Sequence, residues 1–283
     1  MAKLITTDAQ LRSHLPNIIA SVKGETPFIE RLALFLDLAE DWVRTTFTSE
    51  TTFNTICSYT DSNLLKVLTA RLVVADALRR AIPSLDIVLS PNGFAVVNTS
   101  NLAPASKPRV DRLIGSMLSH RDDCIAALLP GLVGASKWLT SSQADFFGAT
   151  LFPDLSLTDQ IPIPNAQLPR SRWERYLELR SQILNLEASL AEEWFSPELM
   201  DVLRRRNLAH TLADTDRRAV TDIQAHILGY LRTGTFNTRR LADTLTYIRR
   251  LPEHFPEWHN SATAQLFSPP IFQNKKKSPG YFF

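Results

Sequence analysis

The 283-residue sequence has few of the residues that disulfide frameworks and phosphate-binding loops require. It contains two cysteines, Cys57 and Cys124, both in apolar surroundings, and nine glycines. Two cysteines of this kind indicate reduced thiols in a cytosolic protein, and no glycine-rich phosphate loop is present. No apolar run approaches the ~18 residues that a membrane-spanning helix needs, and the first residues lack the apolar core of a signal peptide. The composition therefore predicts a cytosolic protein without membrane segments.

Catalytic and metal-binding patterns are also missing from the sequence. None of the histidines pairs with another His, Cys or Glu at a recognised metal-ligand spacing. Asp214 and Asp216 resemble a metal-binding pair, but they stand where a helix should begin, and acidic residues there stabilise the helix dipole. There is no serine elbow and no zinc-protease HExxH motif. We therefore expect no catalytic residues, no cofactor and no metal, and a protein that is not an enzyme.

Helical periodicity dominates the first half of the chain. Thr7 followed by Gln10 is a capping-box pattern that predicts a short first helix. Apolar residues at helical spacing predict further helices over 28–44 and 108–129, and a nearly all-apolar pattern predicts a buried central helix over 62–82. The Thr-rich segment 45–60 is expected to be a turn with irregular structure, and Pro130 with Gly131 is expected to end the helix before it.

A β-hairpin is predicted over residues 85–98. Apolar, β-branched runs flank Asn92-Gly93, and an Asn-Gly step supplies the positive φ angles of a tight hairpin turn. The polar connector that follows ends at Ser106, which is placed to cap the next helix before Pro108. A lone hairpin is marginal in water, so the flanking helices must support it.

The second half of the chain predicts a smaller helical bundle. Four prolines within 152–170 predict a stiff, extended linker. Ser171 and Ser196 are placed to cap the next two helices, and Asp214 or Thr215 a third, before a fourth over 238–251. No internal sequence repeat is evident. The predicted fold is mainly α: a helical domain with an inserted hairpin (1–151), the linker (152–170), a helical bundle (171–251) and an extended aromatic and basic tail (252–283).

Two basic regions are candidates for contacts with partners. Arg204, Arg205 and Arg206 fan around one helical turn, which favours solvent-exposed faces and ion pairs over a phosphate-binding surface. The second region is the tail, where three lysines, 275–277, stand between aromatic residues. Exposed aromatic residues near a chain end lower solubility, so we expect a neighbouring subunit, or alternatively the protein's own core, to hold the tail. The residues predicted to bind partners are Asn92, Gly93, Phe94, Phe272, Lys275, Lys276, Lys277, Tyr281, Phe282 and Phe283.

Two stretches also carry a resemblance to a known family. The resemblance is carried by residues 92–97, 101–107 and 109–114 and by the ending 270–283. In these residues the chain resembles an uncharacterised family found among virion-structure genes of phages and prophages of Bacteroides-like bacteria. The resemblance implies a structural protein of a tailed phage, of the head-to-tail connector or adaptor kind, that docks below the portal as a ring. It implies no catalytic residues.

The expected partners follow from this resemblance and from the helical build. We expect a cyclic homo-oligomer that contacts portal or tail proteins, without a membrane, and that surrounds a channel for DNA without sequence-specific binding. It would reside in the virion, and in the host cytoplasm during assembly. A tail-completion or baseplate part, and a monomeric helical DNA-binding or regulatory protein that uses the arginine cluster, are the alternatives. The formal net charge of +2 is weak for a dedicated nucleic-acid binder.

Overall fold

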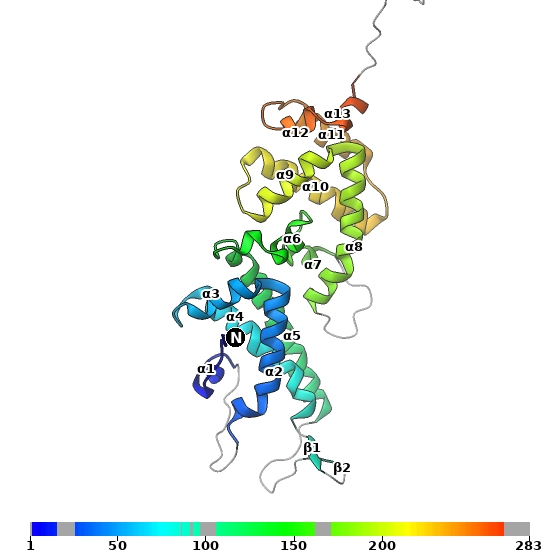
Figure 1. Ribbon diagram of the computed structural model, residues 1–283. Helices are drawn as coiled ribbons and strands as arrows, with labels where there is room; N and C mark the ends of the chain where they lie inside the picture. Colours follow the sequence, from blue (N-terminus) through cyan, green and yellow to red (C-terminus); the bar gives the residue numbers. More distant parts are fainter. Residues whose placement is uncertain are drawn as a thin grey trace, which may run out of the picture.

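The computed structural model describes residues 2–15, 26–85, 87–90, 93–96, 106–161 and 171–268. These residues are mainly helical, which confirms the predicted α class. The helices form an elongated stack, with the N-terminal helices and the hairpin at one end and the C-terminal helices at the other (Figure 1). In chain order the elements are α1 (Asp8–Ser13), α2 (Phe28–Val43), η1 (Arg44–Thr48), α3 (Glu50–Ser58), α4 (Leu64–Ala81), η2 (Ile82–Ser84), β1 (Ile87–Ser90), β2 (Gly93–Val96), α5 (Lys107–Leu132), η3 (Trp138–Thr140), α6 (Ser142–Gly148), α7 (Ser156–Gln160), α8 (Arg172–Leu190), η4 (Ala191–Phe195), α9 (Pro197–Leu208), α10 (Asp214–Thr233), α11 (Thr238–Arg249), α12 (Pro256–His259) and α13 (Ala262–Leu266).

Three predicted helix caps are confirmed and two are wrong. The hydroxyls of Thr7, Ser171 and Ser196 each accept a hydrogen bond at 3.2 Å from a main-chain N–H in the first turn of the following helix. Ser106 directly precedes α5, but its side chain makes no capping hydrogen bond. No side chain caps α10 either, because that helix already includes Asp214 in its first turn, where a carboxylate favours the helix dipole.

Three other local predictions are wrong. Segment 45–60 is not irregular: it holds the π-helical turn η1 and the helix α3. Pro130 does not end α5, which continues to Leu132. Proline removes one main-chain hydrogen bond from the helix, and the last turn of α5 forms without that bond. The start of the predicted tail is helical and packed, since α12 and α13 lie within it and Phe255 and Trp258 are buried. Residues 269–283 lie outside the described residues.

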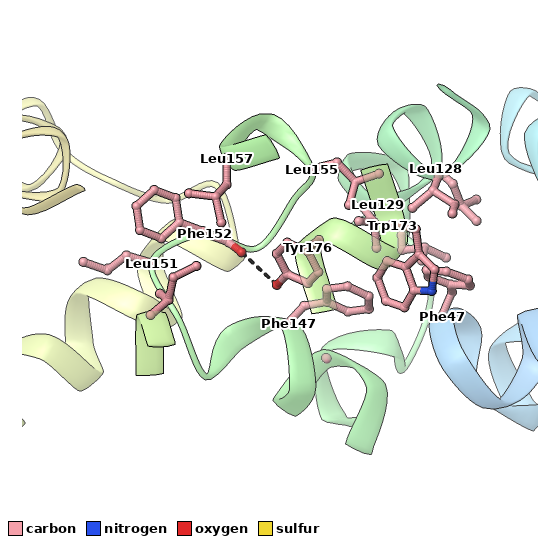
Figure 2. Packing of buried hydrophobic residues seen from close by; sticks show 14 of the residues in the cluster. Phe47, Leu128, Leu129, Phe147, Leu151, Phe152, Leu155, Leu157, Trp173 and Tyr176 are labelled. Carbon is pink, nitrogen blue, oxygen red and sulfur yellow. Dashed lines mark hydrogen bonds between the residues drawn. The ribbon is translucent and has the colours of Figure 1, made fainter. Parts of the chain in front are cut away.

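The first part of the predicted linker, residues 152–161, is folded against the rest of the protein. Residues 152–161 are not an extended connector, because they hold the short helix α7 and bury Phe152, Leu155 and Leu157. Figure 2 shows these side chains packed with Phe147, Trp173 and Tyr176. The hydrophobic gain from burying three large side chains outweighs the local preference of proline for extended backbone. Residues 162–170 lie outside the described residues.

Strands β1 and β2 pair antiparallel with each other, with Ile87 opposite Val96 and Ser90 opposite Gly93. They form a two-stranded sheet that no third described strand joins. The sequence predicted longer strands, over 85–90 and 94–98. The two residues between the strands lie outside the described residues.

Contrary to the prediction, the chain contains an internal repeat, and this repeat organises the fold. A long helix (α2 or α8) runs into a π-helical turn (η1 or η4), then a serine at positive φ, then another helix (α3 or α9). Ser49 has φ 70° and Ser196 φ 63°, a conformation that costs non-glycine residues of order 1–3 kcal/mol, and each caps the helix that follows. The two serines are 147 positions apart (196 − 49), as are the five-residue turns η1 and η4. We call residues 2–148 the first repeat and 149–268 the second.

The end of each repeat carries the same sequence motif and the same anchor. Trp138, Ser141, Ala144 and Phe147 recur 120 positions later (258 − 138) as Trp258, Ser261, Ala264 and Phe267. The indole Nε1 of Trp138 donates to the main-chain oxygen of Phe47 at 2.6 Å. That of Trp258 donates to the oxygen of Trp194 at 2.8 Å, and Trp194 is the residue that corresponds to Phe47. The motif W-x2-S-x2-A-x2-F therefore fastens the end of each repeat to its π-helical turn.

The hairpin lies in an insertion that the second repeat lacks. Buried positions of α4 recur in α10 at a spacing of 150, as in Val73 and Ile223. Those of α5 recur in α11 at a spacing of 120, as in Ile125 and Leu245. The difference (150 − 120) means that the first repeat has 30 more residues between these helices. This insertion contains β1, β2 and the first part of α5.

Candidate functional site

The residues predicted to bind partners are not gathered into a site by the described structure. Gly93 and Phe94 lie in β2, opposite Ser90 and Leu89 of β1. The others lie outside the described residues: Asn92, Phe272, Lys275, Lys276, Lys277, Tyr281, Phe282 and Phe283. Their role in binding stays a prediction.

The described residues contain no group of three or more His, Cys, Asp or Glu side chains that could hold a metal ion. Asp216, one half of the acidic pair near 214, is buried and accepts a hydrogen bond from Arg206 at 2.9 Å. Cys57 and Cys124 are not joined by a disulfide, and burial raises the pKa of each thiol to about 11. A thiol with so high a pKa is a poor nucleophile at neutral pH.

A buried polar site lies at the junction between the repeats. Ser171, which caps α8, donates to Asp122 Oδ1 at 3.1 Å, and the main-chain N–H of Arg172 donates to Asp122 Oδ2 at 2.5 Å. A carboxylate of α5, in the first repeat, therefore binds the N-terminal end of the first long helix of the second repeat. Asp122 and Ser171 are both buried, where such a charge-assisted cap is strong.

Buried charge continues from this cap into α4. Asp76 is fully buried and accepts hydrogen bonds from Arg79 at 2.9 Å and from Arg80 at 2.6 Å. Arg121, 3% exposed, reaches Asp76 at 3.5 Å and Asp122 at 3.2 Å. We call Asp76, Arg121, Asp122 and Ser171 the junction network. It connects α4, α5 and the start of α8, and each of its charges has an opposite charge beside it.

Each repeat also has a buried glutamate that binds the main chain of a non-helical segment. Glu40 of α2 accepts a hydrogen bond from the N–H of Leu4 at 2.8 Å. Glu187 of α8, 147 positions later (187 − 40), accepts one from the N–H of Leu151, also at 2.8 Å. Desolvation raises the pKa of both carboxyl groups, and the hydrogen bonds that they accept oppose that rise. We call residues 3–5 and 150–152 the entry segments, because each leads into its repeat.

A groove of about 410 Å³ opens beside the junction. Trp42 and Phe146 of the first repeat face it together with Trp173 and Leu177 of the second. The rings of Trp173 and Phe47 contact each other at a tilt of 56°, with centroids 4.9 Å apart. The guanidinium of Arg180 lies 3.9 Å from the centre of the Phe146 ring. Local sequence patterns do not reveal this site, because its residues come from three separate segments. The groove is lined by Trp42, Thr45, Thr46, Ser142, Gln143, Phe146, Trp173 and Leu177.

The arginine cluster of α9 is engaged in ion pairs. Arg204 donates to the buried Glu187 at 2.7 Å and to Asp201 at 3.0 Å. Arg206 pairs with Asp216 at 2.9 Å. The ion pairs expected in this cluster are confirmed for Arg204 and Arg206.

The comparisons with known proteins add one family. Residues 26–148 match the model of DUF6712, a family of unknown function. The match ends at Gly148, the last residue of the first repeat. No curated protein and no solved structure matches the chain. The DUF6712 match thus covers most of the first repeat and none of the second. Among the described residues, no helix is both long and apolar enough to cross a membrane.

His226 of the second repeat is expected to make stability depend on pH. Its Nε2 lies 2.9 Å from Thr244 Oγ1, and burial lowers its pKa from the usual 6.5. The nearby Asp222 raises this pKa and Arg240 lowers it, but desolvation is the largest cause. As the pH falls below 6.5 the unfolded chain takes up a proton that the folded chain resists, so the free energy of unfolding should fall.

Urea unfolding of the wild type and of His226→Gln between pH 7.5 and 5 measures this effect. The difference between the two proteins isolates His226 from His14, whose pKa burial also lowers. The variant should lose less stability over this range than the wild type. Parallel curves for the two proteins would exclude His226 as a source of the pH dependence.

Proposed function

We propose that this protein is a structural virion protein of a tailed phage, a head-to-tail connector subunit that forms a ring below the portal. The observation that carries the proposal is the junction between the repeats. The first repeat contributes α5, α6 and η1, whereas the second contributes the unrelated surfaces of α8 and α9. Such a contact joins two different faces of similar units, and when it recurs between subunits it closes into a ring if the rotation permits.

The resemblance of residues 92–97, 101–107, 109–114 and 270–283 to phage virion-structure proteins supports a role in the virion, and the helical build supports the place below the portal. The hairpin supports a role in assembly. It stands at one end of the elongated molecule (Figure 1). Among the described strands, β1 and β2 pair only with each other, so each has a second edge that no described strand covers. An unpaired strand edge is a surface on which a neighbouring chain can add a strand. We therefore place the hairpin and residues 275–283 among the subunit contacts.

The ion pairs of Arg204 and Arg206 weaken the alternative of a monomeric DNA-binding protein. Guanidinium groups that already neutralise Glu187 and Asp216 release fewer counterions on meeting a phosphate backbone. DNA would pass through the ring without sequence-specific contacts. A tail-completion or baseplate protein would use the same kinds of subunit contact. An image of the phage particle would distinguish these positions from a place below the portal.

The mass of the purified full-length chain tests the proposal. Size exclusion with light scattering should give a closed oligomer of one size, and negative-stain images should show rings. The assembly should bind a portal or a tail protein of the same phage. A mass of one chain at every concentration, together with no binding to portal or tail proteins, would overturn the proposed function.

A further inference from the structure

The entry segment of the second repeat is held by several side chains. The N–H of Leu151 and the hydroxyl of Thr150 donate to Glu187 at 2.8 and 2.7 Å. The main-chain oxygen of Leu151 accepts from Gln224 at 2.6 Å and from Asn207 at 2.8 Å. In addition, Tyr176 donates to the oxygen of Phe152 at 2.9 Å (Figure 2). The chain thus enters its second repeat through a segment that is buried and firmly bound.

The entry segment of the first repeat lacks two of these anchors. Leu4 and Ile5 are buried, and the N–H of Leu4 donates to Glu40. The residues that correspond to Gln224 and Tyr176 are Val74 and Ile29, whose side chains have no donor. The hydrogen bonds that Gln224 and Tyr176 give to the second entry segment therefore have no equivalent here. This segment is easier to displace than its counterpart in the second repeat.

A third copy of the entry segment is present in the sequence after the second repeat. Leu151 and Phe152 follow Phe147, the last residue of the first W-x2-S-x2-A-x2-F motif, by four and five positions. Ile271 and Phe272 follow Phe267, the last residue of the second motif, by the same four and five positions. Ile271 has a main-chain N–H to donate, as Leu151 does, and both residues have the size and apolar character of the buried pair.

We propose that residues 270–272 are an entry segment that binds the first repeat of another copy of this chain, at Glu40, in place of Leu4 and Ile5. The N–H of Ile271 donates to Glu40, and Ile271 and Phe272 fill the apolar space that Leu4 and Ile5 occupy. Exchange of equivalent segments between subunits costs little, because the interactions that one chain gives up internally form again between two chains. The inference rests on the proposed function, since the exchange links subunits of the same oligomer.

The first test measures the mass of full-length variants by light scattering. Ile271→Asp with Phe272→Asp should convert the oligomer to a single chain, because a carboxylate cannot enter the apolar space beside Glu40. Gln273→Asp with Asn274→Asp is the matched control: it adds the same charge directly after the segment, outside the contact residues 275–283, and should keep the oligomer. If the first variant keeps the mass of the wild type, the exchange is excluded while the ring stands.

The second test measures binding without requiring a ring. A labelled peptide of residues 266–283 is titrated by fluorescence anisotropy into the full-length Ile271→Asp, Phe272→Asp variant. Adding Leu4→Asp to this protein should raise its affinity for the peptide about tenfold, because the competing segment then occupies the site less often. Absence of binding to both proteins, or equal binding to both, overturns the inference. The peptide could bind more tightly after Leu4→Asp although the wild type is a single chain at every concentration. That result would support the segment site and contradict the ring.

Discussion

Replacing Asp76 with Ala should lower the free energy of unfolding by about 3–5 kcal/mol. Asp76 is fully buried and accepts hydrogen bonds from Arg79, Arg80 and Arg121. When the Asp76 carboxylate is removed, the guanidinium of Arg121, which is 3% exposed, loses one of its anionic partners. The carboxylate that it shares with Arg79 and Arg80 is then gone, and three cations remain around one site. The pairs with Arg79 and Arg80 contribute less, because these side chains are 25% and 33% exposed and solvent screens them.

Guanidinium chloride unfolding followed by circular dichroism measures the loss. Asp201→Ala is the matched control, because Asp201 also pairs with an arginine, Arg204, but is 65% exposed. We expect this control to change stability by at most about 1 kcal/mol. Equal effects of the two substitutions would contradict the view that the junction network depends on burial.

Truncating either motif tryptophan to alanine should cost about 3–5 kcal/mol, the usual loss for a large buried aromatic side chain. Trp138 is 1% exposed and Trp258 is 3% exposed, and each indole N–H donates to a main-chain oxygen of its π-helical turn. Both substitutions leave a cavity and an acceptor without its donor. Because the two tryptophans hold equivalent places, Trp138→Ala and Trp258→Ala should have effects of similar size.

The conservative variants Trp138→Phe and Trp258→Phe separate the hydrogen bond from the packing. Each keeps an aromatic ring but loses the N–H, so we expect losses of about 1–3 kcal/mol. Leu139→Ala, beside Trp138 but 42% exposed, should change stability by under about 0.5 kcal/mol. A large loss at Trp138 with none at Trp258 would contradict the equivalence of the two repeats.

The tandem repeat explains the extent of the DUF6712 match. The matched residues 26–148 stop where the first repeat ends, and the second repeat shares its architecture but little of its sequence. Of the positions aligned between residues 4–58 and 151–205, four are identical: Leu4, Leu32, Glu40 and Ser49 with their counterparts. Glu40 and Ser49 are retained where a buried carboxylate or a strained, capping serine is needed. Elsewhere apolar residues of different shape fill the same buried positions, as Phe53 and Met200 do.

Several local elements of this protein follow from its sequence alone. Apolar periodicity placed the buried helix α4, and hydroxyl caps at Thr7, Ser171 and Ser196 placed three helix starts, because both signals act within a few residues. The sequence also excluded a disulfide framework, since two cysteines in apolar surroundings remain free thiols. These conclusions need no knowledge of what lies across the core.

How these elements repeat and join depends on the tertiary fold. The prolines of 152–170 predicted an extended linker, but burial of Phe152, Leu155 and Leu157 folds its first part against the body. The junction network brings Asp122 to Ser171, a contact across 49 residues of chain that no local pattern encodes. Shared hydrogen bonds align the two repeats more clearly than their apolar residues do, because packing accepts many apolar side chains at a buried position while a buried polar anchor accepts few.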